Sequence, residues 1–330
     1  MGVSHHPSRA VGLLLGVAAD AAFGDPRRGH PVALFGAYAA RLEPHCYGDS
    51  RAAGVRYAVA CVAPVLALGA VVERATRGRP VVHALATAAA TWAVLGARTL
   101  RATGEAMADA LDVDDLDAAR AALPSLCGRS PEGLDAGELG RATVESLAEN
   151  TADAAVASLC WGAVAGVPGL LVHRAANTLD AMVGHRTPRY ARFGTASARL
   201  DDLLDYVPAR VTGLLASGLA PSVGGDARRA WRSLLAGHAR HPSPNGGWCE
   251  AAWAGALGVR LGGRNVYASG VEVRPTLGDE SWPKPGAREV RAASRLVTRV
   301  TLAAAALGAG FASGVAWSAG RRRSGVWRAS

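Results

Sequence analysis

The first side chains whose spacing could do chemistry are three carboxylates in the segment ESLAENTADA. Glu145, Glu149 and Asp153 occupy positions i, i+4 and i+8. On a helix this spacing places all three on one face, where their like charges repel one another unless a cation or a proton lies between them. We interpret the three as catalytic residues, with a solvated helix face as the alternative.

A second group of polar side chains follows the uncharged run 154–172. Asp180 and His185 are predicted to be catalytic, while Asp201 and Asp202 match the aspartate-rich pattern that holds magnesium. The alternative for the two aspartates is a charge that complements a helix N-terminus. Arginine binds phosphate in a bidentate manner. The residues predicted here to bind substrate or phosphate are Arg174, Asn177, Arg186, Arg189, Arg199 and Arg210.

Two segments rich in glycine and proline add further candidates. Near the N-terminus GDP precedes GHPV, whose His30 is predicted to bind substrate, with capping of the next helix as the alternative. The segment HPSPNGGWCE contributes His241, Asn245 and Glu250 as substrate-binding residues. Loops held by a rigid scaffold commonly carry function, so we expect this segment to be a functional loop.

Several classes of site are excluded by the motifs that the sequence lacks. There is no P-loop, no G-x-G-x-x-G and no G-x-S-x-G, so a nucleotide must be bound by side chains. The net charge is +9, yet the arginines are dispersed and no basic-aromatic module occurs, so no nucleic acid is predicted as a partner. Five cysteines without a CxxC pair predict neither a zinc site nor a disulfide framework.

The composition predicts an all-α, polytopic membrane helical bundle. Half of the residues are hydrophobic and only 19% are charged. Uncharged runs occur at 57–72, 81–97, 154–172, 211–223 and 300–320, with a weaker run at 10–19. We expect about five or six spans, with buried core helices as the alternative for the shorter runs. Three arginines, 321–323, follow the last run and predict a cytoplasmic C-terminus.

The expected organisation is a single integral membrane domain over residues 1–330. The first apolar run imitates a signal peptide, but we expect a retained helix. Residues 98–140 are predicted to be a polar excursion that faces the cytoplasm or the membrane interface, and 141–210 to be the central functional stretch. Residues 238–288 are predicted to be a functional loop region, with a small-residue helix at 251–263 and irregular structure after 267.

These segments together resemble the CobD/CbiB family of adenosylcobinamide-phosphate synthases, membrane enzymes of cobalamin biosynthesis. The resemblance is carried, in family order along most of the chain, by GDP, HPV, ESLAENTADA, NTLDAMVGHR, RYARFGTASARLDDLLDYVPAR, HPSPNGGWCEAAWAGALGVRLGG and RPTLG. It implies a ligase that forms an amide between adenosylcobyric acid and aminopropanol or aminopropanol phosphate, giving adenosylcobinamide or its phosphate. The implied cofactors are ATP and Mg²⁺.

The resemblance also implies where the protein works and with what. It implies a multi-pass protein of the cell membrane with a cytoplasmic active site, in contact with lipid and with other enzymes of the pathway. Two alternatives from other classes share some of the features. A membrane prenyl- or alcohol-phosphate transferase would use magnesium-bound aspartates but has no need of the HPSPN loop. A corrinoid or cation transporter would also place charges within helices. Internal repeats would favour this alternative, and the sequence has none.

Overall fold

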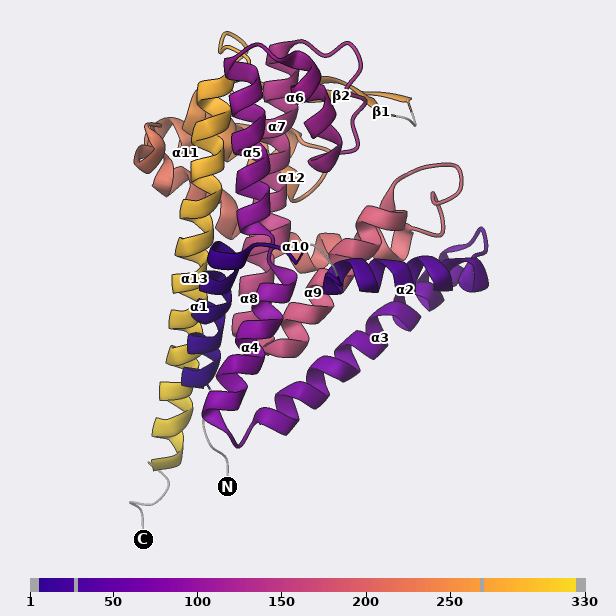
Figure 1. The fold of residues 1–330 in the computed structure, drawn as a ribbon, viewed down its shortest axis with the longest axis vertical. Coiled ribbons are helices and arrows are strands. Elements are labelled where there is room, and N and C mark those ends of the chain that lie inside the picture. Colours follow the sequence, from indigo (N-terminus) through magenta and orange to yellow (C-terminus); the bar gives the residue numbers. More distant parts are fainter. Residues whose placement is uncertain (1–5, 27–28, 268–269, 325–330) are drawn as a thin grey trace. The chain divides into compact units, whose positions relative to one another are not determined.

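The computed structural model describes residues 6–26, 29–267 and 270–324. These residues are mostly helical and form two compact units (Figure 1). Unit 1 comprises Met1–Gly96, Ala157–Leu204 and Ala304–Ser330, and unit 2 comprises Ala97–Val156 and Asp205–Ala303. The predicted central stretch 141–210 is therefore divided, with its middle part in unit 1 and its two ends in unit 2.

Unit 1 is built from apolar helices. Its elements are α1 (His6–Phe23), α2 (Pro31–Cys46), α3 (Arg51–Thr76), α4 (Pro80–Val94), α8 (Ala157–Ala165), α9 (Val167–Leu179), a π-helix (Asp180–Gly184), the start of α10 (Thr195–Leu219) and the end of α13 (Ala287–Ser324). Helix α1 packs along α4, and α3 packs along α9. Close approach of α1 to α4 depends on Gly16, because a Cβ there would lie 2.3 Å from Thr91 Cβ.

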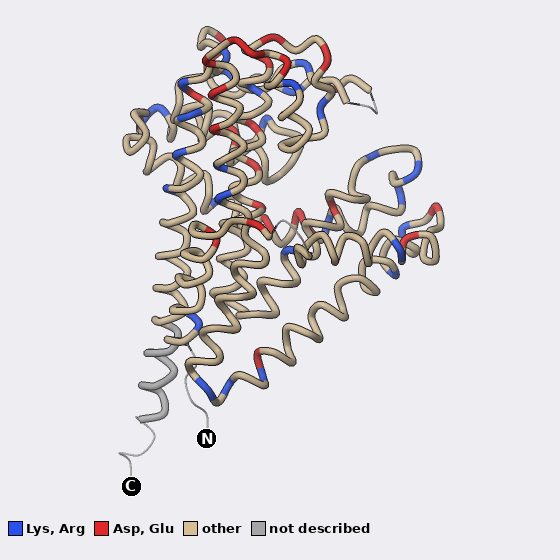
Figure 2. Tube along the Cα trace, in the orientation of Figure 1, with Lys and Arg blue, Asp and Glu red and all other residues tan. Residues whose placement is uncertain are grey.

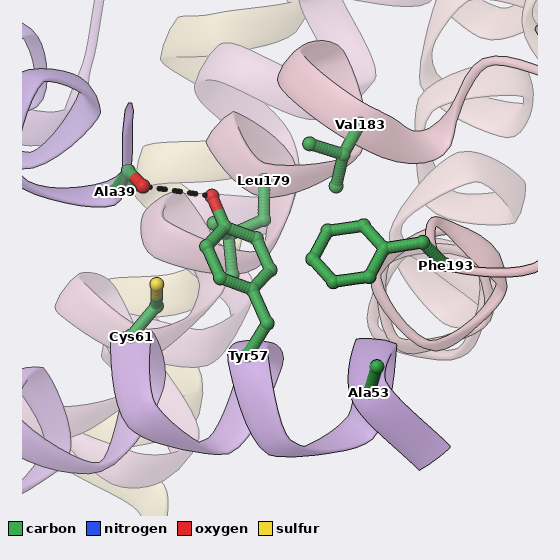
Figure 3. Close-up of a cluster of buried hydrophobic side chains, with 7 residues drawn as sticks. All are labelled: Ala39, Ala53, Tyr57, Cys61, Leu179, Val183 and Phe193. Carbon is green, nitrogen blue, oxygen red and sulfur yellow. Dashed lines mark hydrogen bonds between the residues drawn. The ribbon is translucent and has the colours of Figure 1, made fainter. Parts of the chain in front are cut away.

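An aromatic core joins α2, α3 and α9 within unit 1 (Figure 3). Phe193 is fully buried, and its ring centroid lies 5.1 Å from that of Tyr57 and 5.3 Å from that of Tyr47. The Tyr57 hydroxyl donates a hydrogen bond to the Ala39 carbonyl oxygen at 3.2 Å, so its polar atom is satisfied inside the core. This core fixes the chain around residue 193, which leads into α10.

A buried ionic cluster also joins the helices of unit 1. Glu73 of α3 lies 2.8 Å from Arg9 of α1 and 3.1 Å from His83 of α4. Its second oxygen accepts a hydrogen bond from Val167 N at 3.1 Å, at the start of α9. Charges inside apolar helices are stable when they are paired in this way. The sequence analysis assigned no role to this cluster, because its members come from four separate segments.

Three helical segments of the described residues are long and apolar enough to cross a membrane. They are Arg51–Thr76, Pro80–Asp112 and Ala287–Gly314. The second comprises α4 and α5 (Ala97–Asp112), so part of the predicted polar excursion 98–140 belongs to a candidate span. Figure 2 shows α3 without charged residues between its two ends, and its side chains Val59, Leu68 and Val71 are exposed. Apolar side chains exposed along such a helix are typical of a helix that crosses a membrane.

The predicted number of five or six spans is not confirmed. The run 154–172 is not one span, because α8 ends at Ala165 and α9 begins at Val167. Gly166 lies between them, and its φ of +70° is incompatible with a continuous right-handed helix. Pro168 follows at the start of α9. Arginines 321–323 belong to α13, but the helix does not show which side of a membrane they face. The cytoplasmic C-terminus therefore stays a prediction.

Unit 2 combines helices with one β-hairpin. Its elements are α5, α6 (Leu116–Ala122), α7 (Ala136–Asn150), a π-helix (Thr151–Val156), the end of α10, α11 (Ala227–Gly237), α12 (Gly246–Leu257), β1 (Leu261–Tyr267), β2 (Gly270–Leu277) and the start of α13. Three short 3₁₀ segments complete it at Leu123–Ser125, Ala220–Val223 and His238–Arg240. Asp135 and Asp226 cap α7 and α11 by accepting hydrogen bonds from backbone N–H groups.

The predicted helical fold is confirmed for most of the described residues, and the hairpin is a departure from the all-α prediction. Strands β1 and β2 are antiparallel, with Gly263 opposite Arg274 and Asn265 opposite Glu272. The small-residue helix predicted at 251–263 ends at Leu257, because Gly258 adopts a left-handed conformation and ends the helix. Gly262 allows the strands to meet, since a Cβ there would lie 2.1 Å from the Pro275 carbonyl oxygen. The segment after 267, predicted to be irregular, therefore contains β2.

Candidate active site in unit 2

Glu145 of α7 is the first of the three predicted catalytic carboxylates, and it is 1% exposed. One oxygen forms an ion pair with Arg129. The other accepts hydrogen bonds from Arg141 at 3.2 Å and from Gly262 N at 2.6 Å. Both oxygens are thus occupied by donors of unit 2. A carboxylate held in this way supports the fold around β1 and is poorly suited to accept a proton from a substrate.

The ionic network continues from Arg141 to the surface. Arg141 also forms an ion pair with Glu138, donates to Asn265 Oδ1 at 2.9 Å, and donates to the Arg264 carbonyl oxygen at 2.9 Å. Glu138 in turn lies 2.5 Å from Lys284 Nζ. The network joins α7, β1 and the segment before α13. It thereby fixes the position of Glu145 on α7.

Acidification is expected to weaken unit 2 through Glu138. Burial acts to raise the pKa of this carboxyl, but hydrogen bonds from Lys284 and Arg141 outweigh it and hold the pKa below its ordinary value of 4.5. Stability from this group is therefore present above about pH 4.5 and is lost as the pH falls further. Unfolding measured from roughly pH 6 to pH 3 should show a smaller loss in Glu138→Gln than in the wild type. Equal losses in both proteins would contradict this prediction.

Glu149 lies one turn beyond Glu145 and has a different environment. One ligand atom of each of Glu149, His241 and Glu250 lies within 4.8 Å of the other two. His241 Nε2 is 3.2 Å from Glu250 Oε1. Glu250 of α12 is fully buried, and among the described residues neither of its oxygens accepts a well-aligned hydrogen bond. This cluster of two carboxylates and an imidazole is the group of described residues that could hold a metal ion.

Burial and mutual charge perturb the titration of this cluster. The pKa of the Glu250 carboxyl is raised above its ordinary value, first by burial and then by the negative charge of Glu149. Burial acts to lower the pKa of His241, but the contact with Glu250 outweighs it and the pKa of the imidazole is raised. Such perturbed groups gather at functional sites more often than elsewhere in a protein.

Gly246, the first residue of α12, makes the close approach possible. A Cβ at this position would lie 2.6 Å from Glu149 Oε1 and 2.8 Å from His241 Cε1. The turn before it is fixed by Ser243, whose hydroxyl accepts hydrogen bonds from Asn245 N and Gly246 N at 3.2 Å. The predicted loop is therefore shorter than expected, because both glycines of the NGG segment already belong to α12.

Further predicted residues surround the cluster. Arg210 of α10 donates to Asn245 Oδ1 at 3.0 Å and lies over the Tyr206 ring. The pKa of the buried Cys249 thiol is raised well above its usual value, first by burial and then by the charges of four carboxylates. These carboxylates are Asp153, Glu149, Glu250 and Asp205. The structure thus brings Glu149 close to His241 and Glu250 of the HPSPN segment, two groups of candidates that the sequence analysis treated separately.

Arg274 is a member of the site that sequence reasoning missed. It lies on β2, where its Nη1 is 3.3 Å from His241 Nε2 and 3.7 Å from Glu250 Oε1. Its Nε is 3.3 Å from a Glu272 oxygen. The signal was present in the sequence, because Arg274 opens the RPTLG motif. The motif and the HPSPN segment are far apart in the sequence, so the sequence alone does not show that Arg274 of β2 contacts His241.

Comparison with known proteins identifies the family. The model of the CobD/Cbib protein family matches residues 13–297, which is most of the chain. The chain belongs to the CobD/Cbib family. It is 54% identical over 278 residues to the Cobalamin biosynthesis protein CobD of Mycobacterium tuberculosis (strain ATCC 25618 / H37Rv), covering 84% of this chain and 88% of that protein.

More distant relatives carry the same name. The Cobalamin biosynthesis protein CobD of Geobacter metallireducens is 43% identical over 279 residues, with 82% of this chain and 87% of that protein covered. That of Brucella suis biovar 1 is 36% identical over 322 residues, with 91% and 98% covered. No solved structure matches the chain. The resemblance seen in the sequence is thereby confirmed, and it includes every segment of the site in unit 2.

In this CobD/Cbib protein, the other predicted site residues lie in unit 1. His30 caps α2, since its Nδ1 accepts a hydrogen bond from Val32 N at 3.1 Å, as the capping alternative proposed. Arg189 is 2.9 Å from Glu43 and lies over the Tyr47 ring, so surface partners occupy it. Arg174 donates to Asn177 Oδ1 at 3.2 Å. His185, Arg186 and Arg199 are exposed.

The three aspartates of unit 1 that were predicted as site residues, Asp180, Asp201 and Asp202, do not form a metal-binding group in the described residues. Asp180 lies in the π-helix, with its carboxylate against Gly184, where a Cβ would meet Asp180 Oδ1 at 1.8 Å. Asp201 and Asp202 lie beyond the first turn of α10, which begins at Thr195, so the helix N-terminus does not explain them. Neither belongs to the group formed by Glu149, His241 and Glu250. Their predicted role in metal binding stays a prediction.

A basic cavity of about 420 Å³ in unit 2 was not predicted from the sequence. It is lined by Arg229 and Arg232 of α11 and by Arg240, with Trp282 on another wall. Arg229 is oriented by the carbonyl oxygens of Gly255 and Ala256, to which it donates at 2.7 and 3.1 Å. Asp226 and Asp279 also line the cavity, but the arginines outnumber them, so the cavity suits an anionic ligand.

Proposed function

We propose that this CobD/Cbib protein forms an amide between a propionate carboxylate of adenosylcobyric acid and the amine of aminopropanol or aminopropanol phosphate, at the expense of ATP. The observation that carries the proposal is the buried cluster of Glu149, His241 and Glu250 in the segments that resemble the family's own. An active amide-forming site must neutralise phosphate charge and accept a proton from an amine. Carboxylates and an imidazole at such distances from one another can serve both purposes.

The proposed reaction has two steps that balance. The substrate carboxylate oxygen attacks the γ-phosphorus of ATP, which forms an acyl phosphate and releases ADP. The free amine then attacks the acyl carbon, the C–O bond to phosphate breaks, and inorganic phosphate leaves. The proton of the attacking amine passes to a carboxylate of the site in unit 2. Mg²⁺, when bound, would offset the charge of the ATP phosphates, and carboxylates of the kind found here are its usual protein ligands.

The basic cavity of unit 2 is the proposed site for the phosphates. With no P-loop in the sequence, arginine side chains must supply the positive charge that binds them. Trp282 offers a ring against which an adenine can stack. Helix α11 places Arg229 and Arg232 on the face that lines the cavity, while Arg228 of the same helix lies outside it. The three arginines provide a direct comparison between residues inside and outside the site.

Replacing Arg232 by glutamine is expected to raise the KM for ATP about tenfold, which corresponds to the roughly 1.5 kcal/mol of one charge-assisted hydrogen bond. Turnover at saturating ATP should change little, because the residue binds ground state and transition state alike. Arg228→Gln is the matched control and should leave the KM unchanged. If both variants raise the KM equally, or neither does, the phosphates bind elsewhere.

The function itself is tested with purified protein in nanodiscs. The protein is incubated with adenosylcobyric acid, ATP and either aminopropanol or its phosphate, and the amide product and ADP are measured. Formation of both in equal amounts supports the proposal, and the better amine identifies the substrate. Transfer of a phosphate-bearing group without ADP release would favour a transferase. Movement of a corrinoid into vesicles without any product would favour a transporter.

The proposed location is the cell membrane, crossed several times, with the active site in the cytoplasm, where ATP is available. Support comes from the candidate membrane helices and from the basic cluster after the last of them. Lipid and other enzymes of the pathway are the further proposed partners. A reporter fused after residue 330 tests the orientation, and activity of a periplasmic reporter at this position would refute it.

A further inference from the structure

We infer that Glu149, His241 and Glu250 bind a divalent cation of the first transition series, such as Mn²⁺ or Zn²⁺. Their ligand atoms lie within 4.8 Å of one another. Ligands about 2.1 Å from a shared ion are separated by no more than about 4.2 Å, a distance that small side-chain rotations would reach. The sequence indicated a metal at Asp201 and Asp202 instead, so this site is a different one.

The Glu250 carboxylate is the observation that points to a ligand. It is fully buried on α12, and neither oxygen has a well-aligned hydrogen bond among the described residues. A buried carboxylate with too few donors is costly, because its contacts do not replace the hydration that it loses. The charged neighbours of Glu250 lie beside one oxygen only, with His241 Nε2 3.2 Å and Arg274 Nη1 3.7 Å from Oε1. A cation bound at the cluster would supply the missing interaction.

The charges around the cluster leave room for a divalent cation. Glu145 is neutralised by Arg129 and Arg141, which lie on its own side of α7. Glu149, Glu250 and the nearby Glu272 share Arg274 as the cation that contacts two of them. Arg274 and His241 thus face Glu250 and Glu272, while in the described part of the chain Glu149 forms no ion pair with an arginine or a lysine. Asp153 and Asp205 add further negative charge around the thiol of Cys249, the residue before Glu250.

The surroundings of His241 permit metal binding through Nε2. Its Nδ1 lies 3.1 Å from Ser243 N and 3.4 Å from the Ser243 carbonyl oxygen, so it can accept from the first or donate to the second. When Nδ1 carries the proton and donates to the carbonyl oxygen, the Nε2 lone pair faces Arg274 Nη1 at 3.3 Å, and a bound ion would take the place of that contact. Metal-binding histidines are commonly oriented by such a bond from the other ring nitrogen.

The donor set decides the class of metal. An imidazole nitrogen with two carboxylates suits manganese, iron or zinc, whereas magnesium and calcium prefer oxygen ligands alone. The inference does not rest on the proposed amide formation, because binding of the ion is measured without any substrate. Loss of amide formation with intact metal binding, or the reverse, therefore distinguishes the two proposals.

The test is metal binding by the purified full chain in nanodiscs after treatment with a chelator. Free Mn²⁺ is followed by electron paramagnetic resonance, and bound Zn²⁺ is measured by mass spectrometry after dialysis. We expect one ion per chain, and at least a 10- to 100-fold weaker affinity in Glu149→Gln and Glu250→Gln, the loss that even an outer-shell partner causes. Glu132→Gln, an exposed carboxylate of the same unit, is the control and should bind as the wild type does.

Thermal unfolding keeps the test independent of misfolding. Without metal, Glu250→Gln should unfold no earlier than the wild type, because the change removes a like charge beside Glu149. Mn²⁺ should raise the melting temperature of the wild type and leave that of Glu250→Gln unchanged. Metal binding by both glutamine variants at wild-type affinity would overturn the inference. So would binding of Mg²⁺ in preference to Mn²⁺ and Zn²⁺, or early unfolding of metal-free Glu250→Gln, which would identify a structural ion pair.

Discussion

Replacing Glu145 by glutamine is expected to destabilise unit 2 by about 3–5 kcal/mol, the usual cost of removing one partner from a buried ion pair. Arg129 and Arg141 are 7% and 4% exposed, and both would keep their charge without the carboxylate. Burial alone would lower the pKa of Arg129, but Glu145 outweighs it and the pKa is raised above its usual value, which shows how strongly the two groups interact. Gly262 N would also lose its acceptor.

Glu149→Gln is the matched control for this prediction. The two glutamates lie one turn apart on α7, yet Glu149 faces a second carboxylate while Glu145 faces two arginines. Denaturant unfolding of the purified variants should show a large loss for Glu145→Gln and none for Glu149→Gln. Turnover should be lost in Glu149→Gln although the protein stays folded. Equal stability in the two variants would show that the arginine network contributes nothing to the fold.

The contrast between these glutamates shows what helical spacing can and cannot reveal. Spacing of four residues indicates that both lie on one helix, and both lie on α7. It cannot separate their roles, because those depend on partners distant in sequence. Glu145 contacts Arg129, 16 residues away, and Gly262, 117 residues away. Glu149 lies close to His241 and Glu250, which follow α10 in the sequence.

The same distinction applies to the fold: elements set by local sequence could be predicted, and those set by contacts between distant segments could not. Uncharged runs correctly predict the helices α3 and α4, because composition and helical propensity act locally. The run 154–172 is misleading, because a single glycine at position 166 with positive φ divides it into two helices. The hairpin was missed because β1 contains two glycines and follows a helix of small residues. Its pairing with β2 is a contact between segments, which composition does not show.

The basic cavity was missed for a related reason. The arginines of α11 follow an amphipathic pattern that is equally typical of a solvated helix face. Their convergence on Trp282 depends on the fold of the segment after β2, which has no regular pattern. By contrast, the HPSPNGG segment could be singled out from the sequence, because polar side chains beside two glycines are rare in a chain so rich in alanine and leucine.

Replacing Gly246 by alanine is expected to lower kcat/KM for amide formation about 100-fold, the cost of displacing catalytic groups by about 1 Å. The backbone of Gly246 does not have positive φ, so alanine can adopt its conformation as the first residue of α12. The new methyl group would nevertheless lie 2.6 Å from Glu149 Oε1 and 2.8 Å from the His241 ring. Both side chains must move, and the atoms that move are the ends of side chains rather than the backbone.

Gly218→Ala provides the control for this substitution. Gly218 lies within α10, where a Cβ would meet no atom within 4 Å, so alanine there should keep full activity and gain about 0.5–1 kcal/mol in stability. Gly246→Ala should unfold at nearly the wild-type temperature while it loses turnover and affinity for Mn²⁺ together. A Gly246→Ala variant with normal turnover would show that Glu149 and His241 can separate without consequence. The reacting groups would then have to lie outside the cluster, which would leave two carboxylates packed against each other in a buried site, an arrangement that costs stability.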